Sequence, residues 1–145
     1  MNSNDSFKIN FAIDDLETVG RKKGVLYLKK AFFRNRDLVI PLIETFERKT
    51  ILISIGRDRN KFENFKHFQI RSIIRIGVKD IAGLENWSDD LDTFQYVSKT
   101  IPKALQLASE IAQRGDVVLF SPYGTPEEIQ NQYDLFDNTL ESIGF

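Results

Sequence analysis

The strand-to-helix junction near the carboxyl end is the segment that most narrows the possible folds of this chain. Four consecutive apolar residues, Val117–Phe120, predict a strand that is covered on both faces. The run Thr125-Pro126-Glu127-Glu128 then predicts a capping box with proline in the first helical turn. A strand buried on both faces that leads directly into a capped helix indicates an α/β fold.

Apolar runs extend this prediction along the rest of the chain. The expected parallel strands are Val25–Leu28, Ile51–Ile55, Ser72–Ile76 and Val117–Phe120, with a short edge strand at Phe94–Val97. Alternating apolar and polar residues over Phe7–Ile13 predict a further strand, which we expect to pair with Val25–Leu28 as an antiparallel ribbon. The segment 14–24 between them is rich in turn residues.

Apolar stripes at helical spacing lie between these strands. The stripe over Ile101–Ala112 predicts a long helix that ends at Gly115, and the stripe over Ile129–Ile143 predicts a helix that covers the sheet. A helix is also expected over Leu38–Phe46, with Pro41 in its first turn or at a kink. Shorter helices or packed loops are expected at Phe62–Phe68 and Ile81–Trp87. This alternation predicts a mainly parallel sheet with helices on both faces.

The composition is that of a single domain. The chain has 145 residues, of which 41% are hydrophobic and 28% charged, so we expect one domain over residues 1–145 with an amino-terminal ribbon at about 7–28. The net charge of −1 argues against general nucleic-acid binding. Cysteine is absent, which excludes disulfides and thiolate chemistry. Because we find neither a signal peptide nor an apolar run of ~18 residues, we expect no membrane span and a cytoplasmic location.

Four segments resemble a known family in order and spacing. The segment Arg114–Pro122 resembles the family's G-D-x-V-L-L-S-P strand and Gly24–Leu28 resembles the strand before its N-D-S-K-A-T-N loop, while Ile51–Arg59 resembles L-I-x-G-G-R-D-K and Ser72–Gly77 resembles the next strand. The chain from about Gly24 onward thus resembles the carboxyl-terminal domain of the Mur ligases, most closely that of the D-glutamate-adding member. The resemblance implies a Rossmann-like three-layer domain, with a mainly parallel sheet and helices on both faces, and a link to peptidoglycan precursor synthesis.

The resemblance fails at positions that the family uses for its substrate. The Asp and Lys of N-D-S-K-A-T-N fall on Lys30 and Phe32, and only Asn35 is unchanged. The serine that contacts the incoming amino acid's carboxylate falls on Pro126, which has no hydroxyl and no amide hydrogen, and a following lysine falls on Asn131. We therefore do not expect this chain to bind D-glutamate in the family's mode.

The family's ATP-binding parts are not found in the sequence. No G-x-x-x-x-G-K-S/T phosphate loop occurs, and the segment Gly20–Gly24 has glycines and cations without the required spacing. The family's domain for the UDP-sugar is also not found. We therefore expect no catalysis by the chain alone and no bound cofactor.

Loops that follow parallel strands gather at one edge of such a sheet and offer donors to an anion. The candidate ligand-binding residues on these loops are Lys30, Arg34, Asn35, Arg57, Ser121, Gly124 and Thr125. An alternative interpretation is that the charged residues are only solvated residues on the surface. In that case Ser121–Gly124 merely connects a strand to a helix and binds no ligand. The adjacent aromatics Phe32 and Phe33 suggest an anchor for a protein partner.

Other polar residues give little support for catalysis or metal binding. The single histidine, His67, has no companion that would suggest a triad or a metal site. Asp89, Asp90 and Asp92 lack the glycine and terminal glutamate of a calcium loop. We therefore name no catalytic and no metal-binding residues.

Three functional interpretations remain open from the sequence. The first is a stand-alone relative of the Mur ligase carboxyl-terminal domain, non-catalytic by itself, with a binding or regulatory role near peptidoglycan precursor synthesis. The second is a subunit of a split ATP-dependent amide ligase whose ATPase domain is on another chain. The third is an unrelated α/β domain of flavodoxin-like shape that binds a small anion. The partners we expect are a ligase or another cell-wall enzyme as protein partner and an anionic small molecule as ligand.

Overall fold

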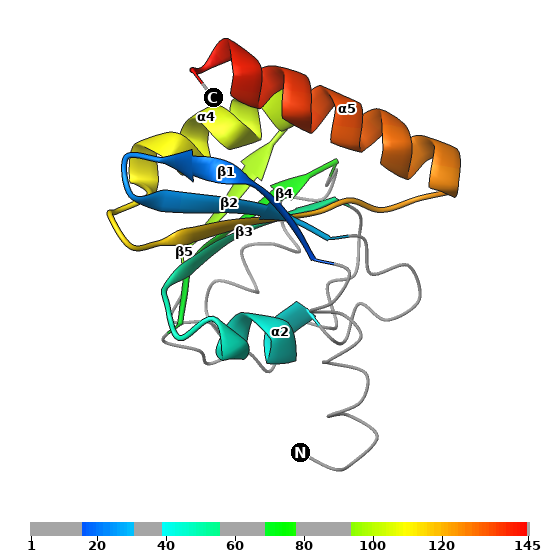
Figure 1. Ribbon diagram of the computed structural model, residues 1–145. Coiled ribbons are helices and arrows are strands. Elements are labelled where there is room, and N and C mark those ends of the chain that lie inside the picture. The colour runs from blue at the N-terminus through cyan, green and yellow to red at the C-terminus, as the bar shows by residue number, and fades with distance from the viewer. Residues whose placement is uncertain (1–15, 31–38, 56–68, 78–93, 145) are drawn as a thin grey trace.

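A mostly parallel sheet lies between two helix layers in the computed structural model of the protein (Figure 1). The structure describes residues 16–30, 39–55, 69–77 and 94–144. Within these ranges the strands are β1 (Glu17–Lys22), β2 (Val25–Lys29), β3 (Thr50–Ile55), β4 (Ile70–Ile76), β5 (Phe94–Ser98) and β6 (Val117–Ser121). The helices are α2 (Val39–Thr45), α4 (Ile101–Ile111) and α5 (Pro126–Ser142). Helices α4 and α5 cover one face of the sheet, and α2 covers the other.

The described sheet has six strands in the order β1-β2-β6-β3-β4-β5. The pairs β2–β6, β6–β3, β3–β4 and β4–β5 are all parallel, and only β1 is antiparallel to its neighbour. The predicted parallel strands, the edge position of β5 and the fold class are therefore confirmed. The last strand in the chain, β6, lies inside the sheet between β2 and β3.

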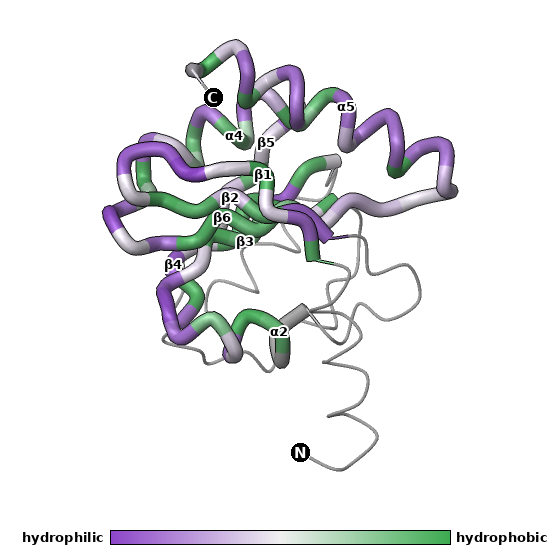
Figure 2. Tube along the Cα trace, viewed as in Figure 1, coloured by the Kyte–Doolittle hydropathy of each residue, from purple (hydrophilic) through white to green (hydrophobic). Residues whose placement is uncertain are grey.

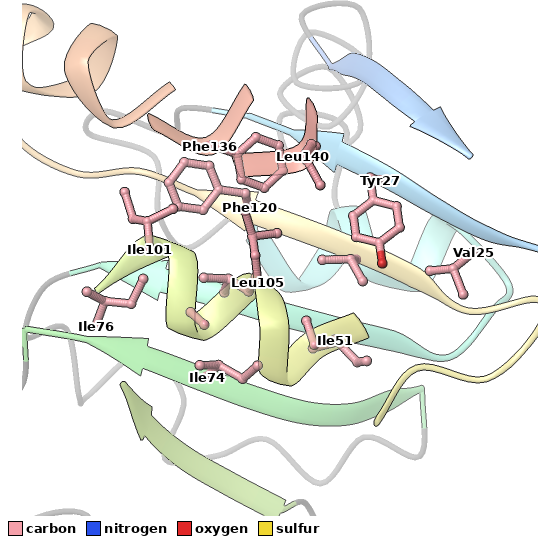
Figure 3. Packing of buried hydrophobic residues seen from close by; sticks show 14 residues of the cluster. Val25, Tyr27, Ile51, Ile74, Ile76, Ile101, Leu105, Phe120, Phe136 and Leu140 are labelled. Carbon is pink, nitrogen blue, oxygen red and sulfur yellow. The ribbon is translucent and has the colours of Figure 1, made fainter. Parts of the chain in front are cut away.

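The central position of β6 explains its unbroken apolar sequence. Val117 and Leu119 pack in the cluster that contains Leu42 of α2, whereas Val118 and Phe120 face α4 and α5. The ring of Phe120 stacks on Phe136 of α5 with a centroid distance of 4.6 Å (Figure 3). Alternate side chains of β6 thus pack into two hydrophobic clusters, one on each face of the sheet. Figure 2 shows the inner strands as largely hydrophobic and α5 as largely hydrophilic.

The helix boundaries follow from local capping. The Thr125 side chain accepts a hydrogen bond from the Glu128 amide, and the Glu128 side chain accepts one from the Thr125 amide, so the predicted capping box is confirmed. Helix α4 ends at Ile111, earlier than predicted, because Ala112 has an extended ψ of 141°. Gly115, with φ +94°, belongs to the turn that leads into β6.

The amino-terminal side of the described sheet differs from the prediction. The neighbours of β2 are β6 on one side and β1 on the other, so the predicted pairing of Phe7–Ile13 with Val25–Leu28 is wrong. The ribbon is instead a hairpin whose two turn residues, Lys23 and Gly24, have φ values of 54° and 77°. Two consecutive positive φ values are typical of the type I′ turn, which matches the twist of a two-residue hairpin.

Some predicted elements lie outside the described residues. These are the Phe7–Ile13 strand itself and the short elements at Phe62–Phe68 and Ile81–Trp87. Among the helices in the described ranges, none combines the length and the apolar character needed to cross a membrane.

Candidate ligand-binding site at the carboxyl edge of the sheet

The helices that come after two neighbouring parallel strands lie on opposite faces of the sheet. Strand β2 is followed by α2 on one face, whereas β6 is followed by α5 on the other (Figure 1). The Lys30 amide donates a hydrogen bond to the Phe120 carbonyl over 3.0 Å, so the ends of both strands lie side by side. Such a topological switch point is where open α/β sheets bind their ligands. The pair β2–β6 therefore marks the candidate site.

Four polar residues from four adjacent strands form one row at this edge. Ser54 of β3 is the register partner of both Ser121 of β6 and Arg75 of β4. Lys30 follows the paired residues Lys29 and Phe120, which puts it next to Ser121. The residues two positions earlier in these strands, Leu28, Leu119, Leu52 and Ile73, all belong to the core cluster on the α2 side. Because side chains alternate along a strand, the four residues of this polar row face the α2 side.

Three members of the polar row are almost fully buried. Ser54, Arg75 and Ser121 are 2%, 1% and 1% exposed, and Lys30 is partly buried. The Ser121 hydroxyl has no hydrogen-bond partner within the described part of the protein. Burying a hydroxyl without a partner costs roughly 1–3 kcal/mol, so its presence needs an explanation. A guanidinium group inside a sheet is equally unusual, because arginine is rarely fully buried.

The neighbouring lysine has a different role. Lys29 Nζ lies 2.8 Å from Asp137 Oδ2 of α5 and 3.5 Å from Glu17 Oε2 of β1. The same ammonium group lies 4.7 Å from the centre of the Tyr133 ring, in the range of a cation–π contact. Its side chain is only 11% exposed. Lys29 therefore joins α5 to the β1–β2 ribbon on one face of the sheet, and Lys30 belongs to the other face.

The loop between β6 and α5 uses many of its donors internally. The Thr125 amide donates to Glu128 Oε1 over 3.1 Å, and the Tyr123 amide donates to Gln132 Oε1 over 2.9 Å. Gly124 has φ +135°, and a Cβ atom there would lie 3.0 Å from the Glu128 side chain. Glycine thus allows Glu128 to fold back over the start of α5, where its carboxylate occupies a position that suits an anion.

The structure brings together part of the site that the sequence predicts. Lys30 and Ser121 lie side by side, and Gly124 and Thr125 follow on the same loop. Arg34, Asn35 and Arg57 lie outside the described residues. Sequence reasoning missed Ser54 and Arg75, although a charged residue inside the apolar run Ile73–Ile76 was a signal for the latter. Within the described ranges, no group of three or more His, Asp or Glu side chains is placed to hold a metal ion.

The sheet, its two helix layers and the switch point define a Rossmann-like α/β domain. No family model matches the sequence. However, the chain is 30% identical over 125 residues to the UDP-N-acetylmuramoylalanine--D-glutamate ligase of Desulfitobacterium hafniense strain Y51, a match that covers 81% of this chain and 27% of that enzyme. The ligase of the same name from Salinibacter ruber is 29% identical over 136 residues, covering 88% of this chain and 29% of the enzyme. The chain thus spans only about a quarter of the length of these relatives.

Solved structures agree with this relationship at the level of the fold. A domain from Haemophilus ducreyi 35000HP, ascribed to a UDP-N-acetylmuramate:L-alanyl-gamma-D-glutamyl-medo-diaminopimelate ligase, matches with a TM-score of 0.59 and 9% identity, covering 86% of this chain and 98% of that domain. The MurF ligase of Thermotoga maritima matches with a TM-score of 0.55 and 16% identity, covering 86% of this chain and 31% of that enzyme. The chain is a relative of the Mur ligase carboxyl-terminal domain, as the sequence motifs predicted. This relationship removes the interpretation as an unrelated domain.

Proposed function

We propose that this domain binds a small ligand bearing a carboxylate or phosphate group, and that it serves peptidoglycan precursor synthesis as a binding or regulatory module without catalysing a reaction by itself. The observation that carries the proposal is the buried Ser121 hydroxyl beside Lys30 at the switch point. A ligand oxygen would accept the hydrogen bond that this hydroxyl otherwise lacks.

The chemistry of the polar row favours an anion. Lys30 and Arg75 supply positive charge, Ser54 and Ser121 supply hydroxyl donors, and the row contains no carboxylate. A guanidinium group in a desolvated setting favours carboxylate or phosphate, which it can bind through two parallel hydrogen bonds. Arg34, Asn35 and Arg57 are proposed as further contacts, because the loops that carry them follow β2 and β3 in the sequence.

The proposed lack of catalysis rests on the sequence. The 145 residues contain no phosphate loop of the G-x-x-x-x-G-K-S/T type that would hold ATP. The expected outcome for this domain is therefore ligand binding without release of ADP from ATP.

Calorimetric titration tests the proposal with three ligands, UDP-N-acetylmuramoyl-L-alanine, D-glutamate and inorganic phosphate. We expect binding of the nucleotide precursor or of phosphate, and no measurable binding of D-glutamate. Ser121→Ala should weaken that binding about tenfold or more, because a hydrogen bond to a charged group contributes roughly 1.5–3 kcal/mol. Ser72→Ala is the matched control, because Ser72 is also buried but precedes Ile73 and so lies on the other face of β4. Release of ADP by the domain alone, or equal binding by Ser121→Ala and the unchanged protein, would contradict the proposal.

A second candidate is a component of an ATP-dependent acid–amino-acid ligase whose ATPase domain lies outside these 145 residues. The match to about a quarter of the relatives' length favours it. The test is to mix the domain with a Desulfitobacterium hafniense ligase that lacks the segment matched by this chain. ADP release that needs both parts would support this candidate, and no release above that of either part alone would contradict it.

A further inference from the structure

The edge of the sheet opposite the candidate site gathers cationic side chains. The β1–β2 turn, the α2–β3 turn and the α4–β6 turn all lie there, because β2, β3 and β6 begin at this edge (left in Figures 1 and 2). The cations of these turns and of the end of β1, which we call the basic edge, are Arg21, Lys22, Lys23, Arg48, Lys49 and Arg114. All are exposed to solvent except Lys22, which is partly buried.

Backbone hydrogen bonds hold the three turns against one another. The Gly115 amide donates to the Gly24 carbonyl over 2.8 Å, and the Val117 amide donates to the Lys49 carbonyl over 2.9 Å. A Cβ atom on Gly24 would lie 2.5 Å from Arg114 Cγ, so the Arg114 side chain lies directly across the hairpin turn. The backbone segments that carry these cations are therefore held side by side at this edge.

Cations outnumber carboxylates on this surface. Glu47 is exposed in the turns themselves, and Glu44, Glu110 and Glu141 are exposed in the last turns of α2, α4 and α5. Asp116 is buried and already bound by Arg71, with distances of 2.6 Å and 3.0 Å to its two oxygens. Six cations, of which Lys22 is partly buried, thus lie beside four exposed carboxylates in a chain whose net charge is −1. The positive charge is concentrated at this edge.

Two residues of these turns have an uncommon backbone conformation. Lys23 and Glu47 are the residues other than glycine with positive φ in the described ranges, at 54° and 53°, and both lie in these turns. Asparagine or glycine is the usual residue at the Lys23 position of such a turn. Lys23→Asn therefore removes the charge with a residue that suits this conformation.

Acidic surface limits how far the basic edge extends. Helix α5 contains Glu127, Glu128, Asp134, Asp137 and Glu141 and no lysine or arginine. Its carboxyl end is beside the hairpin, because Lys22 Nζ lies 2.9 Å from the position that a Cβ of Gly144 would take. A long polyanion laid across the basic edge would meet this helix and be repelled. A short acidic segment would not extend along α5, of which only the carboxyl end, with Glu141, is beside the hairpin.

We infer that the basic edge is a docking surface for a short acidic segment of a partner protein. Ion pairs with Lys23, Lys49 and Arg114 would hold the segment, and its binding would fall steeply with ionic strength. The surface lies at the opposite edge of the sheet from Lys30 and Ser121, so a docked partner leaves the candidate ligand site open.

Fluorescence anisotropy with a labelled short oligoglutamate peptide tests this inference, with a labelled short DNA duplex as the competing polyanion. The test variant is Lys23→Asn combined with Lys49→Gln, and the matched control is Lys99→Asn combined with Lys103→Gln, which removes two exposed cations where β5 meets α4. Asparagine suits the positive φ of residue 23, so the test variant keeps its fold, which its melting temperature verifies.

We expect the test variant to bind the peptide about fivefold more weakly, since two exposed ion pairs contribute roughly 0.5 kcal/mol each at low salt. The control variant should bind like the unchanged protein. Equal weakening in both variants, or none in either, would overturn the inference. Tighter binding of the DNA duplex than of the peptide at physiological salt would overturn it as well, in favour of a nucleic-acid surface.

Discussion

The substitution Ser121→Ala should make the protein more stable while it weakens ligand binding. The Ser121 hydroxyl is buried, and no described residue accepts its hydrogen or donates to its oxygen. In the free protein this hydroxyl is therefore a desolvated polar group without compensation. Alanine has the same backbone preferences at this strand position and removes only the oxygen.

The expected change in the free energy of unfolding is the difference between two opposing contributions. Relief of the buried, unpaired hydroxyl contributes roughly 1–3 kcal/mol in favour of the variant. Loss of the oxygen's packing contacts costs about 1 kcal/mol, because each atom pair contributes only about 0.1–0.2 kcal/mol. The variant should thus gain about 1 kcal/mol in its free energy of unfolding. For a chain of this size that gain corresponds to a melting temperature higher by about 3 °C.

Urea unfolding of the unchanged protein and Ser121→Ala, monitored by circular dichroism without added ligand, measures this difference. The slope of the free energy against urea should be the same for both proteins, so the change appears in the midpoint alone. A destabilisation of more than about 1 kcal/mol would show that the hydroxyl has a partner within the fold, and would refute the reasoning that it is reserved for a ligand.

Four further substitutions test the packing and electrostatics. Leu119→Ala should cost about 2–5 kcal/mol because it leaves a cavity at a fully buried position, whereas Thr125→Ala should cost only about 0.5–2 kcal/mol through loss of the helix cap, and urea melts giving the reverse order would contradict the assigned core and cap. Asp116→Ala should destabilise the protein by about 3 kcal/mol because Arg71 loses its bidentate partner and the Gln113 amide loses its acceptor, and thermal melts unaffected by the change would rule out that role. Burial raises the pKa of the Tyr27 phenol above its ordinary value of 10.0, so the contribution of the neutral phenol is fully present below pH 10.0 and is lost as the pH rises through the folded-state pKa. Tyr27→Phe should therefore flatten the loss of stability above pH 10.0, and an unchanged alkaline slope in melts from neutral to alkaline pH would contradict this.

The core of the fold could be predicted from the sequence because its signals are local. The apolar run Val117–Phe120 and the capping box at Thr125 each depend on a few adjacent residues, and both are confirmed. Strand β1 was missed because Glu17–Lys22 is mostly polar and its hairpin turn has lysine where asparagine is usual. Its pairing with β2 is visible only once the sheet is assembled.

The candidate site, like the fold, could be predicted only in part from the sequence. Lys30 and Ser121 could be placed at the same edge of the sheet, because both follow strands that the sequence predicts to be parallel. That these two strands are neighbours is seen only in the structure. Ser54 and Arg75 could not be placed beside them, because their alignment with Ser121 depends on the register of three strands that are far apart in the sequence. The hydrogen bond from the Tyr123 amide to Gln132 was equally impossible to predict, since it arises when the Gln132 side chain folds back from α5.

The central claim is that the polar row at the carboxyl edge binds an anionic ligand. A nuclear magnetic resonance titration tests this claim most directly. Backbone amide shifts of the isotope-labelled protein are followed as UDP-N-acetylmuramoyl-L-alanine, and separately inorganic phosphate, is added. Saturable shifts with at least one of the two ligands, largest at Lys30, Ser54, Arg75 and Ser121, with little change at Lys23 and Lys49, are the predicted result. No saturable shift in the polar row with either ligand, or shifts confined to the basic edge, would contradict the claim.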